Sequence, residues 1–211
     1  MMSNAGTVGN NTPPQDLPAE TGERILPGET AIRAVINVAG GGKIVTLGAP
    51  GLCIAHDGET WLSPEDIVET MRDLVALRVR LLVFLAEAGE CPPDMWQMMR
   101  SACVDSGIRF LVLPIMDFCA PSPAWERAWR KIAPCVSDLF AMDKAIAACC
   151  LYGGGRSGTV AAMILQERGM ATNDAVAMVR RGFPDSIESH IQDAWLREHA
   201  RRRNHDTEGS T

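Results

Sequence analysis

The stretch AACCLYGGGRSGT, residues 147–159, joins an apolar run, a cluster of glycines and the beginning of a helical pattern. Three consecutive glycines follow the apolar run at 153–155, and apolar residues at helical spacing continue from Val160. Glycine can adopt positive φ, so successive N–H groups of such a loop can converge on one point. The N-terminus of the following helix adds partial positive charge. The stretch therefore predicts an anion-binding loop between a strand and a helix.

Other apolar runs along the chain predict the rest of a sheet, with strands at 34–38, 43–47, 81–85, 110–113 and 145–149. Several are apolar at consecutive positions, as strands covered on both faces are. Helices are expected at 63–77, 93–106, 122–140, 157–169, 172–181 and 187–202. This alternation predicts an α/β fold of three layers, with a mostly parallel central sheet flanked by helices on both faces. Ligands of such sheets bind beyond the carboxyl ends of the strands.

Length and composition predict one domain at 31–203, preceded by a flexible arm at 1–28 and followed by a disordered tail at 204–211. The net charge of −6 argues against a nucleic-acid partner. Arg201-Arg202-Arg203, the one basic cluster, is interpreted as a solvated helix end. No apolar run has the length of a membrane helix, which predicts no membrane partner. Seven scattered cysteines suit a reducing compartment, and we expect a cytoplasmic protein.

Two motifs that overlap the glycine loop fit its context poorly. Residues 153–158 match the dinucleotide fingerprint, but the next segment, 172–176, predicts a helix where a strand ending in an acid is required. Residues 155–159 are one residue short of a nucleophile elbow. The acid and histidine of such a hydrolase would be Asp185 and His190, which lie only five residues apart near the end of the chain. Both interpretations are therefore weak.

The motif Cys150-x5-Arg156-Ser157 fits both the chemistry and the context. Loop amides and a helix N-terminus favour the thiolate, which is the nucleophilic form of cysteine. Arg156 offers a planar fork for two phosphate oxygens, and Ser157 can donate to the sulfur when it becomes a leaving group. Cys149 is interpreted as a buried core residue. The N–H groups that would bind phosphate belong to Leu151, Tyr152, Gly153, Gly154, Gly155 and Arg156.

A phosphoenzyme mechanism also needs an acid to protonate the leaving oxygen. Asp117 follows the strand predicted at 110–113, so its loop would lie at the same sheet edge as Cys150. Prolines at 114, 121 and 123 restrict that loop. An aspartate in this place can equally form a turn by bonding to its own backbone. The residues alone leave both roles open.

Taken together, these motifs resemble the dual-specificity branch of the protein tyrosine phosphatases, particularly the kinase-associated phosphatase type, over about residues 31–200. The stretch Pro114-Ile115-x-Asp117-x3-Pro121 resembles the general-acid loop of that family, and 187–192 falls where the family has a helix near the active site. The resemblance implies hydrolysis of phosphotyrosine, phosphoserine or phosphothreonine in a protein, with a kinase as one candidate partner. Cys150 would form a phosphocysteine and Asp117 would act first as acid and then as base, with no metal or other cofactor.

Departures from the family pattern occur at two places. Cys149 stands where the family usually has histidine, which puts a second thiol beside the nucleophile, and Cys119 lies in the acid loop. Both are candidates for a reversible disulfide or sulfenic-acid switch with Cys150. Glu188 stands where related chains often have glutamine. A catalytically weak module that binds a phosphoprotein or kinase through the same loop is the alternative function.

The remaining signals in the chain favour neither metal nor nucleotide chemistry. Histidines at 56, 190, 199 and 205 have no close-paired ligand spacing and are interpreted as helix surface where they lie in helical segments. Gly40-Gly41-Gly42-Lys43 is followed by Ile44, where a nucleotide loop needs serine or threonine, so we interpret it as a turn. The 151–155 segment has no basic residue. Phosphatases that act on phosphoinositides tend to have basic residues there, so a singly phosphorylated substrate is favoured.

Overall fold

A computed structural model describes residues 30–55 and 57–208, with side chains through 203. Its centre is a five-stranded sheet in the order β1-β2-β7-β5-β6. The strand β1 pairs antiparallel with β2, and the other neighbours are parallel. The bounds are β1 Ile32–Asn37, β2 Lys43–Leu47, β5 Val79–Phe84, β6 Arg109–Val112 and β7 Ala145–Cys149. The five predicted strands are confirmed, two of them at the predicted bounds.

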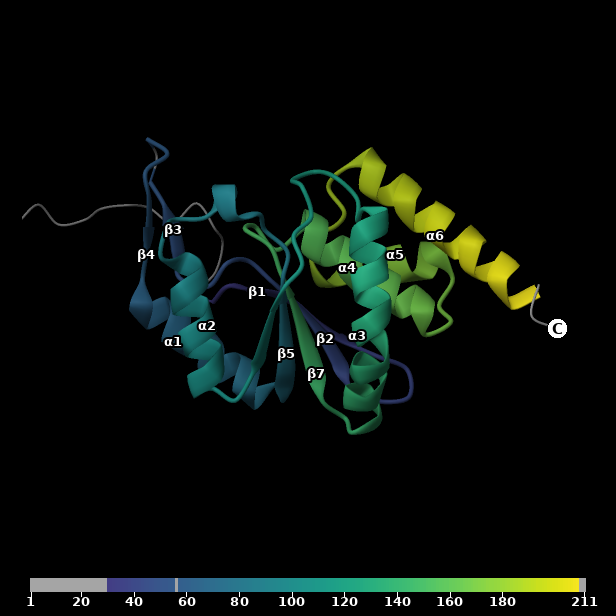
Figure 1. Ribbon diagram of the computed structural model, residues 1–211, viewed down its shortest axis with the longest axis horizontal. Helices are drawn as coiled ribbons and strands as arrows, with labels where there is room; N and C mark the ends of the chain where they lie inside the picture. Colours follow the sequence, from purple (N-terminus) through teal and green to yellow (C-terminus); the bar gives the residue numbers. More distant parts are fainter. Residues whose placement is uncertain (1–29, 56, 209–211) are drawn as a thin grey trace, which may run out of the picture.

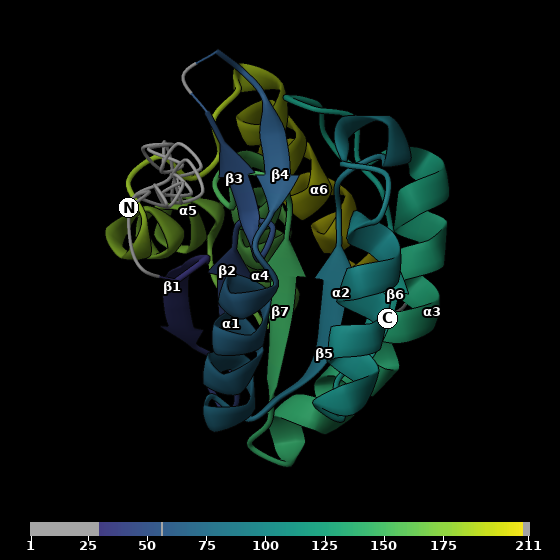
Figure 2. The same ribbon diagram turned by 90° about the vertical axis from the view of Figure 1, so that its left-hand side faces the viewer.

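Helices cover both faces of this sheet (Figures 1 and 2). On one face lie α1 (Pro64–Ala76) and α2 (Met95–Asp105). The other face carries α3 (Pro123–Ala141), α4 (Gly155–Glu167), α5 (Thr172–Gly182) and α6 (His190–Glu208). The predicted three-layer α/β class is therefore confirmed. No helix in the described part of the chain is long and apolar enough to cross a membrane.

The two helical layers enclose two apolar clusters, one on each face of the sheet. Successive side chains of a strand point to opposite faces. On β7, Ala147 and Cys149 therefore lie in the cluster with α1 and α2, while Ala148 and the next residue after the strand, Cys150, lie in the cluster with α3 and α4. The helix α4 is buried from residue 155 through residue 166. Its buried polar side chains, such as Arg156 and Thr159, form hydrogen bonds within the protein.

Local signals in the sequence account for the starts of α1 and α3. The hydroxyl of Ser63 accepts a hydrogen bond from the backbone N–H of Asp66, and that of Ser122 accepts one from Trp125. A proline follows each serine in the first turn. Ser63 and Ser122 are thus the N-caps of the two helices, which were expected at 63–77 and 122–140.

Some features differ from the sequence-based expectations. A hairpin of β3 (Leu52–Ile54) and β4 (Thr60–Leu62) was not expected, because three-residue strands leave too short a pattern to detect. The helix α6 continues to Glu208, beyond the expected domain boundary at 203. The expected arm at 1–28 lies outside the described residues, as do 209–211.

The position of β7 between β2 and β5 brings the carboxyl ends of three parallel strands together. The glycine loop starts there and contacts the segment that follows β2. Ala49 N–H donates to the carbonyl of Leu151 at 2.9 Å, and Cys150 N–H donates to that of Leu47 at 3.3 Å. Gly153 has φ +92° and lies very close to Gly48. A Cβ added to Gly153 would lie 2.5 Å from the backbone nitrogen of Gly48. This approach requires glycine at 153.

We predict that Gly153→Ala lowers the free energy of unfolding by about 2–4 kcal/mol, because it adds a left-handed alanine and a clash with backbone atoms. Gly107→Ala is the matched control, since Gly107 also has positive φ but has open space around it. That control should cost about 1–2 kcal/mol. Urea unfolding of both variants measures the difference, and equal losses would contradict the close approach at Gly153.

Candidate active site

The glycine loop surrounds the sulfur of Cys150, which is buried at the end of β7. Gly153 N–H donates to Cys150 Sγ at 3.1 Å. The helix α4 begins at Gly155, with Gly154 as its N-cap, so its N-terminal end adjoins the loop. A backbone donor and a helix N-terminus both favour negative charge at this place. The loop therefore has the local structure that the sequence predicted for an anion site.

Arg156 extends from the first turn of α4 and is 3% exposed. Its Nη1 lies 2.7 Å from Glu90 Oε1 and donates to the carbonyl of Ile115 at 3.1 Å. Its Nη2 lies 3.1 Å from Asp117 Oδ1. Burial disfavours the charged guanidinium, but the hydrogen bond to Glu90 and the nearby Cys150 and Asp117 outweigh it and raise the pKa of Arg156. The guanidinium is thus held charged and oriented.

The loop after β6 places Asp117 over the guanidinium, with its carboxylate half exposed. The start of α6 holds this loop in place, since Ser189 Oγ donates to the carbonyl of Phe118 at 2.6 Å. Gln192 Nε2 donates to the carbonyl of Cys119 at 3.4 Å. The ion pair with Arg156 shows that the structure brings Asp117 to the glycine loop, as a general acid would require.

Ser157 is fully buried behind the loop, and its hydroxyl donates to the carbonyl of Leu47 at 3.5 Å. The sequence analysis assigned this hydroxyl to the sulfur of Cys150. Cys150 N–H donates to the same carbonyl of Leu47, so the two residues share one acceptor. A donation from Ser157 to the sulfur during the reaction stays a prediction.

The side chain of Tyr152 lies on the outer side of the loop, against Arg33 and Asp185. The guanidinium carbon of Arg33 lies 5.6 Å from the centre of its ring, and Arg33 Nε donates to its carbonyl at 3.0 Å. The Tyr152 hydroxyl donates to Asp185 Oδ2 at 2.8 Å. These contacts anchor the outer side of the loop.

Cys149 lies on the opposite face of the sheet from Cys150. Its thiol is fully buried and donates to the carbonyl of Gly48 at 3.3 Å. Burial raises the pKa of the Cys149 thiol well above its ordinary value. A disulfide between these two neighbours would need the end of β7 to rearrange, and Cys119 is half-buried in the acid loop. A redox switch through either thiol stays a prediction.

Glu90 is the site residue that the sequence analysis missed. It ends the short helix η1 (Ala88–Glu90) after β5, and its Oε1 accepts both from Arg156 and from the backbone N–H of Glu87 at 2.7 Å. The sequence held one signal for this residue: Glu90 follows a strand whose carboxyl end adjoins that of β7, and it lies three positions after Glu87. Its partner, Arg156, lies 66 residues farther along the chain, so the sequence does not reveal the pair.

Glu188, noted as a departure from the family pattern, lies against the first residue of α4. The backbone N–H of Gly155 bonds to its carboxylate. Burial and the nearby Asp117 and Asp185 raise the pKa of Glu188, although the bond from Gly155 and the charge of Arg156 oppose this. The mouth of the loop therefore has an acidic rim.

Comparison with known proteins places this architecture in one class. No protein-family model matches the chain. The crystal structure of Tk-PTP in the active form is similar with a TM-score of 0.57 and 24% identity, covering 82% of this chain and 97% of that one. The kinase associated phosphatase KAP, with its catalytic-site cysteine replaced by serine, is similar with a TM-score of 0.63 and 18% identity, covering 81% and 94%. PTPMT1 in complex with PI(5)P has a TM-score of 0.51 and 13% identity, covering 80% and 98%.

These similarities show that the chain has the fold of the protein tyrosine and dual-specificity phosphatases. The resemblance that the sequence motifs indicated is confirmed at the level of the fold.

We predict that Arg156→Lys lowers kcat/KM for a phosphate monoester at least about a hundredfold, because a point charge cannot replace a bidentate fork. Arg80→Lys is the control, since Arg80 lies in β5 and bonds to the carbonyl of its neighbour Val79. Steady-state kinetics and a thermal melt of both variants separate chemistry from stability. Activity of Arg156→Lys within a few-fold of the parent would show that Arg156 is no clamp.

Proposed function

We propose that this protein is a cysteine-dependent phosphatase that hydrolyses phosphate monoesters through a phosphocysteine intermediate. The observation that carries the proposal is the meeting of Cys150, Arg156 and Asp117 at one end of the sheet, within a glycine loop at a helix N-terminus. These groups supply a nucleophile, a clamp for phosphate oxygens and a proton donor. The fold supports the same class of chemistry.

In the first step, the Cys150 thiolate attacks phosphorus while the bond from phosphorus to the leaving oxygen breaks. Asp117 protonates that oxygen, and Arg156 exchanges its contact with Asp117 for phosphate oxygens. The backbone N–H groups of the loop bind the same oxygens, and that of Gly155 exchanges its contact with the Glu188 carboxylate for phosphate. Preorganised donors of this kind stabilise the charge of the transition state. Glu90 keeps the other side of the guanidinium in place during this exchange.

In the second step, Asp117, now a carboxylate, takes a proton from water as the water attacks phosphorus. The sulfur–phosphorus bond breaks, Cys150 leaves as thiolate and inorganic phosphate is released. Ser157 would stabilise the departing sulfur if its hydroxyl turns from Leu47 to Cys150. Both steps balance without a redox reagent.

The substrate we propose is a phosphorylated protein, with a kinase as one candidate. The residues of the 151–155 segment are uncharged, and the rim carries Asp117, Asp185 and Glu188. Arg180 borders the same mouth, but its guanidinium donates to the carbonyls of Ser186 and Ile187. A rim of this charge disfavours a substrate with several phosphates. KAP is described as kinase associated, whereas PTPMT1 was crystallised with PI(5)P. The two substrate classes to compare are therefore phosphoproteins and phosphoinositides.

The decisive experiment is hydrolysis of a small aryl phosphate in reductant and chelator, with the parent and Cys150→Ser compared. We expect turnover by the parent and a loss of at least about a thousandfold in the variant, since the hydroxyl of serine is a far weaker nucleophile than thiolate. Cys149→Ser is the matched control, because it makes the same atomic change one residue away and should keep most of the activity. Equal activity of parent and Cys150→Ser would refute the mechanism.

A parent protein that binds vanadate tightly but turns over no aryl phosphate would favour the alternative, a phosphoprotein-binding module.

For the substrate class, we expect kcat/KM for a phosphotyrosine or phosphothreonine peptide to exceed that for PI(5)P by at least about tenfold, given the acidic rim. Release of inorganic phosphate from each substrate measures this preference. The substitution Glu188→Gln should narrow the gap by removing one rim charge. A preference of the parent for PI(5)P would overturn the assignment to phosphoproteins.

A further inference from the structure

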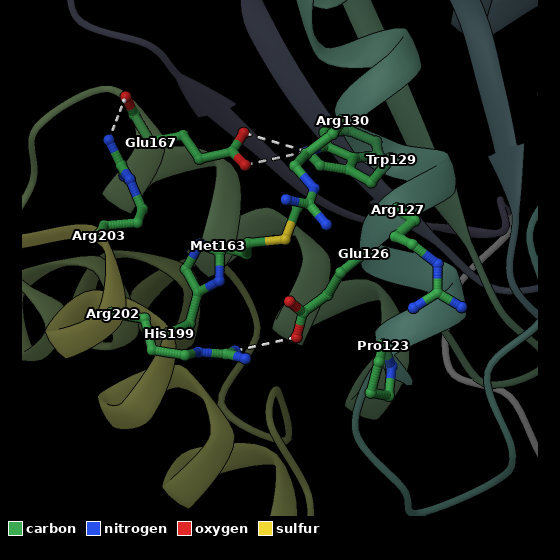
Figure 3. A pocket seen from close by; sticks show the side chains of 10 residues that line it. All are labelled: Pro123, Glu126, Arg127, Trp129, Arg130, Met163, Glu167, His199, Arg202 and Arg203. Carbon is green, nitrogen blue, oxygen red and sulfur yellow. Dashed lines mark hydrogen bonds and ion pairs between the residues drawn. The ribbon is translucent and has the colours of Figure 1, made fainter. Parts of the chain in front are cut away.

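A second charged cavity, of about 450 Å³, lies between α3, α4 and α6. Figure 3 shows side chains from α3 and α6 facing one another across it. Trp129 and Met163, which are almost fully buried, lie at its floor. None of the residues that line it belongs to the glycine loop or the acid loop. The arginines at its rim are Arg127, Arg130, Arg202 and Arg203.

The walls of the cavity are fixed by contacts between their own side chains. Trp129 Nε1–H donates to both carboxylate oxygens of Glu167 at 3.1 Å. Arg203 Nη2 donates to the carbonyl of Glu167 at 3.2 Å, and Arg202 Nη2 lies 2.9 Å from Glu126 Oε1. These bonds cross from one helix to another (Figure 3), so the cavity is formed before any ligand enters. Arg201 and Arg202 are exposed near the end of α6, as interpreted from the sequence, whereas Arg203 is half-buried.

The charge of the cavity is positive. Four arginines against two glutamates give an excess of two positive charges when His199 is neutral. Both carboxylates are already engaged, Glu167 by Trp129 and Glu126 by Arg202 and Trp195. An anion that enters would therefore meet carboxylates whose charge is partly balanced.

Three donors in the cavity are available to a ligand. Within the described part of the chain, Arg127 and Arg130 form no hydrogen bond or ion pair. His199 Nε2 is buried and has no hydrogen-bond partner among the described residues. Burial lowers the pKa of His199 to about 4, so its imidazole is neutral at pH 7. The expectation that this histidine lies on a helix surface is thus wrong, and a buried polar nitrogen of this kind calls for a partner.

We propose that this cavity is a binding site for a small organic phosphate monoester, distinct from the catalytic loop. A phosphate dianion matches the excess of two positive charges, and its oxygens can accept from the guanidinium groups of Arg127 and Arg130 and from His199 Nε2–H. Figure 3 shows the guanidinium of Arg130 extending toward Met163, while Arg127 lies nearer Pro123. The organic part of the ligand would lie beside Pro123, over the floor that Trp129 and Met163 form.

The test is a titration with glycerol 3-phosphate, followed by the indole N–H signals in ¹H–¹⁵N spectra. The Trp129 signal, assigned by comparison with Trp129→Phe, reports on the cavity itself, because this N–H bonds to Glu167. The titration is done in the Arg156→Lys protein, where hydrolysis and binding at the catalytic loop are weakened. Binding in the cavity is thereby read independently of the proposed activity.

We expect a saturable shift of the Trp129 signal and at least a tenfold weaker affinity in Arg130→Gln, which removes a charge-assisted donor. Arg201→Gln is the matched control, since Arg201 is exposed, pairs with Glu198 and lies outside the cavity. Its affinity should equal that of the parent background. A Trp129 signal that does not move, or equal affinities in the two variants, would overturn the site. Equally tight binding of succinate would overturn the assignment to phosphate esters.

Discussion

The buried guanidinium of Arg156 is the interaction on which the candidate site depends. It projects from the helix after β7 and bonds to Glu90 after β5 and to Ile115 and Asp117 after β6. One side chain therefore joins the segments that follow three neighbouring parallel strands. Removing one partner of a buried ion pair typically costs about 3–5 kcal/mol, because the other charge is left unpaired. The contacts that orient the guanidinium of Arg156 are thus the same contacts that hold these loops together.

The sheet supplies the second constraint, by separating the two adjacent cysteines. The side chains of Cys149 and Cys150 point to opposite faces of β7, into different apolar clusters. The thiol of Cys149 is buried and bonds to the carbonyl of Gly48. The sulfur of Cys150 lies within the glycine loop, where it accepts a hydrogen bond from Gly153 N–H. Two adjacent cysteines therefore have different surroundings, because successive side chains along a strand point to opposite faces of the sheet.

The helical layer of α3, α4 and α6 connects the two candidate sites without sharing residues between them. The helix α4 begins at the glycine loop and carries Met163 and Glu167 to the second cavity two to three turns later. The helices α3 and α6 start beside the acid loop, and Ser189 and Gln192 bond to that loop directly. Farther along α6, Arg202 pairs with Glu126 in the first turn of α3, and this contact crosses the second cavity. The helices thereby place the two proposed anion sites at different points along one layer.

Local sequence determined much of this protein. Apolar runs gave the five strands of the main sheet, serine followed by proline gave the starts of α1 and α3, and the Cys150-x5-Arg156 spacing gave the loop. These features depend on residues close together in the chain, where periodicity and capping act. Tertiary structure alone decided that Glu90 and Asp117 both pair with Arg156, and that His199 and Arg202 line a cavity. Those pairings join residues tens of positions apart, and only the order of strands in the sheet and the packing of helices on it bring them into contact.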